Sequence, residues 1–428
     1  MSGRSRLAIL RLMATARLPA FGAAHARSLA LAGRALLVFL AVFTLYWSTA
    51  LLLGRASSHP YAYFPEQAEA FLAGRLWINP PPWTMDLTFA DGRWYVPFPP
   101  LPALLLLPWV AVAGAKGVNT VLFSCVLGAA AATVLFLILE QAARLGWVTL
   151  PGDNRLLLVA LLAMGSVQWQ VTLSGAVWHL WQEAGLVAVL LAVLLALTGR
   201  GPLLVGGALA LAMLARPHLA LTWPLLMGIV AQRWRDDGLS WPVVGWRLVG
   251  WTARAGVPLA LAAGGLLGYN WARFGSPLDF GYTRQVLYDH HAVKLATWGW
   301  FSLHYLPENL HAMLLALPRW EHGTLRPDWN GMSVLLTTPA LVLLPRARRP
   351  RLLVVAAWLA IALLLVPLMT YYNTGYKQFG YRFSLDLMPA ALLLLALASG
   401  RQLAGWVIVL IGVGMVVNAW GVLAVYAG

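Results

Sequence analysis

The sequence predicts an all-α protein that crosses a membrane many times, and three observations lead to this prediction. Hydrophobic residues make up 60% of the 428 residues, and charged residues make up only 11%. Long apolar segments recur along the chain, and Arg is concentrated in a few of the segments between them. A soluble protein of this size needs more charge to cover its surface, so we expect a polytopic membrane protein.

The first expected element is a basic arm, residues 1–34, followed by an apolar segment at 35–54. This apolar segment is longer than the core of a signal peptide, which has about 7–15 residues. Arg-rich segments next to spans remain on the cytoplasmic side of a membrane. We therefore expect an uncleaved first span with a cytoplasmic arm, and a single transmembrane domain over residues 35–428.

Ten further segments have the length and hydropathy of spans, although several are short or contain Pro. They are residues 118–140, 156–173, 178–198, 202–215, 217–232, 255–272, 331–345, 352–370, 387–399 and 402–426. The sequence therefore predicts about eleven transmembrane helices. The single cysteine, Cys125, lies within one of these segments, so no intramolecular disulfide is expected.

The apolar run at 101–114 is not counted among the spans, because it is short and contains Pro. The basic segments 233–254 and 346–351 mark the cytoplasmic side. Alternating spans backwards from 233 places the start of 118–140 outside, where the first span also ends. An even number of crossings must then lie between 55 and 117, so we expect a re-entrant or interfacial helix near 101–114.

Three outer loops follow from this topology: residues 55–117, 273–330 and 371–386. Eight of the nine His residues fall on the outer side, so chemistry is expected there. Glu66 and Glu69 share one face of a short amphipathic helix, although they are also consistent with a solvated surface. His179 and Glu183 share a face at the start of a span, where an ionisable group indicates function.

Each basic residue of the outer side is consistent with two roles. Arg side chains near an interface bind lipid phosphate or anchor a helix in the headgroup region. Arg216 lies between two spans, and Arg382 with Asp386 at spacing four is equally consistent with a structural ion pair. No Walker-type or dinucleotide-binding motif occurs on the inner side, so use of a nucleotide-linked substrate there is not expected.

A set of motifs resembles bacterial members of the GT-C glycosyltransferase superfamily, whose relatives include protein O-mannosyltransferases and the aminoarabinose transferases that modify lipid A. The motifs read AEAFLAGRLWI, DGRWYVPFPPLPALLLLPWVAV, GAVWHLWQEAG, LARPHLALTWPLL, YNWARFGSPLDFGY and QFGYRFSLDLMPAALLLL. They span nearly the whole chain in the expected order. The resemblance implies a GT-C-like membrane enzyme of the bacterial inner membrane with an extracytoplasmic active face.

The resemblance also implies roles for particular residues. The acid that follows the first span in better-known branches is replaced here by SSHPYAYF, which has none. Glu69 is then the first candidate for the catalytic base, and Glu66 and His59 follow. Candidates for binding the substrate or its lipid phosphate are Arg216, Arg273, Lys377, Arg382, His179, Glu183 and Tyr381. Carboxylates also bind divalent cations, and the sequence leaves the need for a metal open.

The function implied is transfer of a hexose from a polyprenyl-phosphate donor to a glycan, lipid or protein acceptor. Membrane lipid is an expected partner and nucleic acid is not, because the basic balance is explained by cytoplasmic loops. Two alternatives stay open. One is a flippase or transporter of a lipid-linked sugar, which predicts internal repeats and mid-membrane polar residues. The other is an inactive scaffold for envelope assembly, since the usual acid is missing.

Overall fold

The structure is a computed structural model that describes residues 3–321 and 323–426, with side chains from residue 26 onward. His322 and the side chains of most of the expected basic arm lie outside the described residues. Most of the described part is helical, and its few strands form two short hairpins. The predicted fold class, an all-α polytopic membrane protein, is confirmed.

In the described part of the chain, five helices are long and apolar enough to cross a membrane. They are the Ala26–Leu52 part of α1 (Gly3–Leu52), α4 (Thr120–Arg144), α7 (Val177–Leu197), α14 (Arg351–Thr370) and α16 (Gly405–Tyr426). Shorter or less uniformly apolar helices complete the bundle: α5 (Gly152–Ala163), α8 (Pro202–Ala215), α9 (Trp223–Asp236), α10 (Trp241–Phe274) and α15 (Met388–Ala398). α1 is continuous through position 34, so no structural break separates the expected arm from the first span.

Several predicted spans are interrupted. The segment 156–173 divides into α5 and α6 (Gln168–Thr172), and 217–232 divides into η2 (Pro217–Thr222) and α9. The segment 331–345 becomes α13 (Val334–Thr337) followed by η6 (Pro339–Arg346). Two of these breaks come just before a Pro, Pro224 and Pro339, and Pro disfavours helical geometry at the residue that precedes it.

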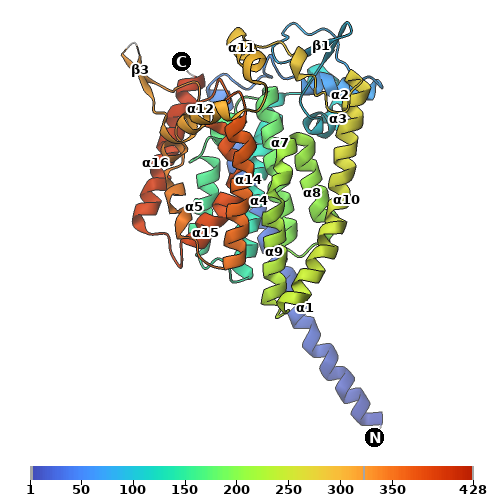
Figure 1. The fold of residues 1–428 in the computed structure, drawn as a ribbon. Coiled ribbons are helices and arrows are strands. Elements are labelled where there is room, and N and C mark those ends of the chain that lie inside the picture. Colours follow the sequence, from blue (N-terminus) through green and yellow to red (C-terminus); the bar gives the residue numbers. More distant parts are fainter. Residues whose placement is uncertain (1–2, 322, 427–428) are drawn as a thin grey trace.

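The long connections gather at one end of the bundle, which we call the loop end (Figure 1). It carries α2 (Phe64–Leu72), α3 (Leu101–Ala113), α11 (Asp289–Trp298), α12 (Leu306–Leu310) and the hairpins β1–β2 (Thr88–Ala90, Arg93–Tyr95) and β3–β4 (Arg319–Glu321, Thr324–Arg326). α16 ends at the loop end, and α1 begins at the opposite end, which we call the basic end. The two ends of the described chain therefore lie on opposite sides of the bundle, as an odd number of crossings requires.

Helix α3 corresponds to the apolar run that we expected not to cross. It has 13 residues with Pro108 inside and packs against α2, α7 and α8. Its place beside α2 at the loop end is visible in Figure 1. A helix of this length rises about 20 Å, which is less than the hydrocarbon thickness of about 30 Å. The expectation of a short helix that does not span is therefore confirmed.

The central helix of the bundle is α7, which packs against α4, α8 and α9. On one flank, α8 and α10 approach each other closely at Gly206. A Cβ atom at Gly206 would lie 2.0 Å from the carbonyl oxygen of Ala255, whereas a Cβ at Gly207 would meet no atom within 4 Å. The absence of a side chain at position 206 therefore permits the contact that holds α10 against the bundle.

Candidate active site

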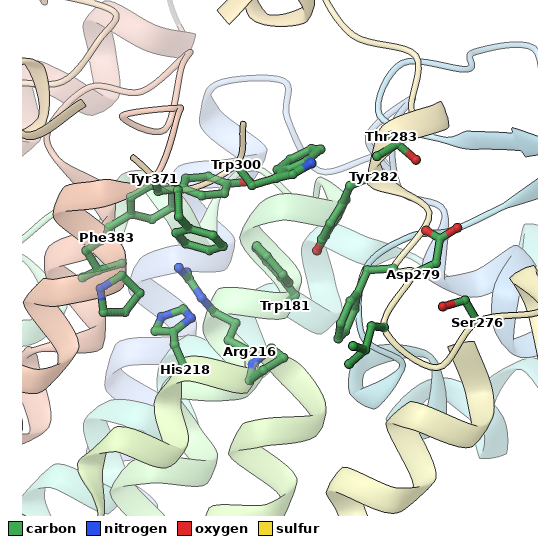
Figure 2. Close-up of a pocket in the computed structure, with 16 residues that line it drawn as sticks. Trp181, Arg216, His218, Ser276, Asp279, Tyr282, Thr283, Trp300, Tyr371 and Phe383 are labelled. Carbon is green, nitrogen blue, oxygen red and sulfur yellow. The ribbon is translucent and has the colours of Figure 1, made fainter. Parts of the chain in front are cut away.

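A cavity of about 730 Å³ opens at the loop end between α7, η2, α14 and the segment that follows α10 (Figure 2). Its lining is Trp181, Arg216, Pro217, His218, Ser276, Leu278, Asp279, Phe280, Tyr282, Thr283, Trp300, Phe301, Pro367, Leu368, Tyr371 and Phe383. Most of these side chains are aromatic or aliphatic, and a few ionisable groups lie among them. Such a cavity suits a ligand with a large apolar part and one charged group.

Arg216 projects into this cavity because the chain changes direction at its backbone. Pro217 disfavours helical geometry at the residue before it. Accordingly, α8 ends and Arg216 adopts an extended conformation, with φ −141° and ψ 106°. The turn directs the guanidinium between the rings of Trp181 and Phe383, whose centroids lie 4.9 and 5.0 Å away.

The Arg216 guanidinium is buried and only partly satisfied. Its Nη2 lies 3.0 Å from Oδ2 of Asp386, and both side chains are 2% exposed. The Nε2 atom of His218 lies 2.8 Å from the same Asp386 oxygen. The Nε and Nη1 atoms of Arg216 have no hydrogen-bond partner in the described part of the chain. Buried donors are almost always paired, so these two indicate a place for an anionic ligand.

A second buried arginine, Arg382, lies near this network but does not line the cavity. Its guanidinium donates to the carbonyl oxygens of Trp178, at 3.1 Å, and Gly375, at 3.2 Å. It also donates to Oε1 of Gln182 at 3.3 Å. All three partners are neutral, so the charge of Arg382 is held in place without a contacting counter-ion. It adds a fixed positive potential to this region.

Asp86 is a candidate that sequence reasoning did not single out. It has a positive φ of 63°, a conformation that Asp tolerates better than most residues. Gln285 donates to its carbonyl oxygen at 2.9 Å and to its Oδ1 at 3.3 Å. Burial raises the pKa of Asp86 to about 7, and the positive charge of Arg382 opposes that rise. A carboxyl group with such a pKa can accept a proton near neutral pH.

The three residues expected to provide the base do not line the cavity, and neither does Asp86, whose distinguishing feature is its raised pKa near Arg382. Glu66 and Glu69 are exposed on α2, and Oε1 of Glu69 accepts a hydrogen bond from the amide of Ala115 at 3.3 Å. Nδ1 of His59 accepts a hydrogen bond from the amide of Tyr61 at 3.1 Å. Burial lowers the pKa of His59 to about 4, so its ring is neutral at pH 7.

His179 and Glu183 share a face of α7, as expected from their spacing, but no hydrogen bond joins them. Glu183 accepts from the hydroxyl of Thr172 at 2.6 Å and from the amide of Gln168 at 2.8 Å. His179 is buried, and neither ring nitrogen has a partner in the described part of the chain. The two residues therefore belong to different polar environments.

The other candidates for phosphate binding are separated from the cavity. Arg273 donates to the carbonyl oxygen of Val96 and to Asn270, both at 2.8 Å, so it ties α10 to the segment before α3. Lys377 is exposed, and the Tyr381 hydroxyl is buried and donates weakly to the backbone of α14, at 3.4 Å. Among the described residues, no group of three or more His, Cys, Asp or Glu side chains is arranged to hold a metal ion.

Comparison with known proteins defines the fold. Neither a family model nor a curated protein sequence matches the chain. The structure is similar to the crystal structure of ArnT from Cupriavidus metallidurans bound to undecaprenyl phosphate, with a TM-score of 0.50 and 14% sequence identity. The match covers 85% of this chain and 59% of the ArnT chain, so this chain spans well under two thirds of that protein. At this identity the likeness concerns the fold alone, and the chain has a GT-C-like multi-pass membrane fold.

Proposed function

We propose that this protein transfers a sugar from a polyprenyl-phosphate donor to an acceptor at the outer face of the bacterial cytoplasmic membrane. The observation that carries the proposal is the Arg216 guanidinium, buried in a largely apolar cavity with two nitrogen atoms, Nε and Nη1, that have no partner among the described residues. The fold likeness adds support, because the neighbouring ArnT crystal structure is described as bound to undecaprenyl phosphate. The loop end is then the extracytoplasmic side.

The cavity has the properties that such a donor requires. Its volume of about 730 Å³ lies within the usual range of small-molecule sites, roughly 300–1,000 Å³. Phe280, Phe301 and Leu368 provide an apolar wall for the isoprenoid chain. Arg216 then binds the phosphate, and the aromatic rings above it, Tyr282 and Trp300, face the sugar (Figure 2).

The proposed reaction is a single displacement at the anomeric carbon. The acceptor hydroxyl loses its proton to Asp86 as its oxygen bonds to that carbon. The bond from the carbon to the phosphate oxygen breaks at the same time, with inversion, and the lipid phosphate leaves as an anion. Arg216 and Arg382 stabilise the negative charge that develops on the phosphate. No protonation of the leaving group is needed, because a phosphate is a weak base.

The experiment measures transfer of radiolabelled sugar by purified protein in liposomes. The donors are polyprenyl-phosphate mannose, glucose, galactose and arabinose, and the acceptors are extracted membrane fractions. Wild type is compared with Asp86→Asn, with Glu69→Gln and with a control, Arg319→Lys, which changes an ion pair with Asp328 outside the cavity lining. We expect transfer by wild type and control, and none by Asp86→Asn.

Two outcomes contradict the proposal in different ways. Loss of transfer in Glu69→Gln with full activity in Asp86→Asn would assign the base to α2 and leave the reaction class intact. Absence of transfer with every donor, combined with movement of labelled donor between leaflets, would show a flippase instead.

A further inference from the structure

A second cavity, of about 680 Å³, lies at the basic end of the bundle, away from the candidate active site. It is formed where α9 ends and where α10 and α14 begin (Figure 1). Its lining is Gln232, Arg235, Asp236, Trp241, Arg349, Pro350, Arg351, Leu352 and Val355. None of these residues has a role in the reaction proposed above.

The cavity carries an excess of positive charge. Three arginines line it, Arg235, Arg349 and Arg351, against one acid, Asp236, so the lining has a net charge of 3 − 1 = +2. In the described part of the chain, neither Arg349 nor Arg351 makes an ion pair or a side-chain hydrogen bond. Two guanidinium groups therefore remain available to a ligand.

Both carboxylate oxygens of the single acid of the lining, Asp236, already accept hydrogen bonds. Oδ2 of Asp236 accepts a hydrogen bond from Nε1 of Trp147 at 2.6 Å, and Oδ1 accepts from Nε2 of Gln232 at 2.8 Å. Arg235 folds over the ring of Trp241, 4.6 Å from its centroid, and donates to the carbonyl oxygen of Leu239. Among the described residues, Asp236 forms no ion pair with the cavity arginines, so it does not neutralise them by direct contact.

One wall of the cavity is apolar and faces outward. The side chains of Trp241 and Val355 are 58% and 56% exposed, and Leu352, which also lines the cavity, is half-buried. A soluble anion gains nothing from contact with an apolar wall. A lipid, by contrast, can pack its acyl chains against this wall while its phosphate contacts the arginines. Basic cavities between helices at the cytoplasmic side of a membrane are suited to anionic headgroups.

We propose that this cavity binds the headgroup of an anionic phospholipid, and that a lipid with two phosphates, cardiolipin, fits it best. The net charge of +2 matches the two negative charges of that headgroup. Arg349 and Arg351 each contact one phosphate, and Trp241 packs along an acyl chain. The amide groups of the first turn of α14, which begins at Arg351, add a positive dipole to the same site.

The experiment is native mass spectrometry of the detergent-purified chain with added cardiolipin, phosphatidylglycerol, phosphatidylethanolamine or inorganic phosphate. The test variant is Arg349→Gln/Arg351→Gln. The matched control is Arg346→Gln/Arg348→Gln, which removes the same charge from the same segment but not from the cavity lining. We expect one tightly bound cardiolipin on wild type, about tenfold weaker binding in the test variant and a less than twofold change in the control.

Each other outcome counts against the proposal. Equal weakening in both double variants would show diffuse attraction to the basic end rather than a site. Binding of phosphatidylethanolamine as tightly as cardiolipin would remove the role of charge, and displacement of cardiolipin by inorganic phosphate would indicate a site for a soluble anion. A melting temperature equal to that of wild type confirms that each variant is folded. Sugar transfer is not the readout, so this test is independent of the proposed function.

Discussion

Substitution of Arg216 by Lys separates ligand binding from structure at the candidate active site. Removing the charge altogether would leave the buried Asp386 carboxylate without its main counter-ion, which destabilises a protein by about 3–5 kcal/mol. Lys retains a positive charge near Asp386 but lacks the planar guanidinium, whose Nε and Nη1 have no partner among the described residues. The variant therefore changes the contacts offered to an anion while preserving the charge balance of the site.

The size of the effect follows from the two unpartnered donors of Arg216. A hydrogen bond to a charged group contributes about 1.5–3 kcal/mol. Loss of one such bond to the lipid phosphate raises Kd roughly tenfold to 150-fold. We expect Arg216→Lys to show this weakening and to keep a melting temperature close to that of wild type.

The assay is binding of radiolabelled undecaprenyl phosphate to the protein in nanodiscs, with thermal denaturation measured in parallel. Arg319→Lys is the control, because Arg319 pairs with Asp328 and neither residue lines the cavity. An unchanged Kd in Arg216→Lys, with a normal melting temperature, would refute the assignment of Arg216 as the phosphate ligand. Weaker binding of undecaprenyl phosphate in both variants would show that the assay responds to any substitution of Arg by Lys.

Three further predictions concern catalysis and packing. Asp86→Asn should lower the rate of sugar transfer about 10²–10⁴-fold without changing lipid binding. In wild type, a base with a pKa of about 7 should give a transfer rate that rises with pH up to about 7 and is constant above it. A pH-independent rate would contradict this role of Asp86. Glu69→Gln should retain most activity in the same assay, because its exposed carboxylate contacts only a backbone amide. Gly206→Ala should lower the free energy of unfolding by about 1–3 kcal/mol through contact with Ala255, while Gly207→Ala should change it little, as measured by thermal denaturation.

The fold was largely predictable because lipid imposes simple constraints on sequence. The expected span at 202–215 coincides with α8, since Pro202 suits a first helical turn and Pro217 prevents continuation. The breaks within 156–173 and 331–345 were not predicted, because uniform hydropathy does not reveal where neighbouring helices force a turn. The requirement for an even number of crossings between residues 55 and 117, set by the Arg-rich segments, supported the exclusion of 101–114 from the list of spans.

The candidate site was only partly predictable. Arg216 was identified by its position between two spans, although an anchoring role was then equally consistent. Asp86 was missed because its environment is assembled from distant segments: its amide donates to the carbonyl oxygen of Val286, some 200 positions along the chain. The sequence showed an acid in an outer loop, but not that Arg382 and Gln285 would lie near it. Glu69 was favoured on resemblance, although the sequence was also consistent with a solvated surface, and the structure shows Glu69 exposed on α2.

The pairing of Arg216 with Asp386 has a consequence for turnover. On the proposed reaction, the donor is a phosphodiester and the released carrier is a phosphomonoester with more negative charge, so a buried guanidinium with no counter-ion would retain the spent carrier more firmly than the loaded one. Asp386 neutralises Arg216 in the empty cavity, so departure of the lipid leaves no isolated charge behind. The carboxylate thereby shortens the residence time of the product. Its contribution lies in carrier recycling rather than in bond formation.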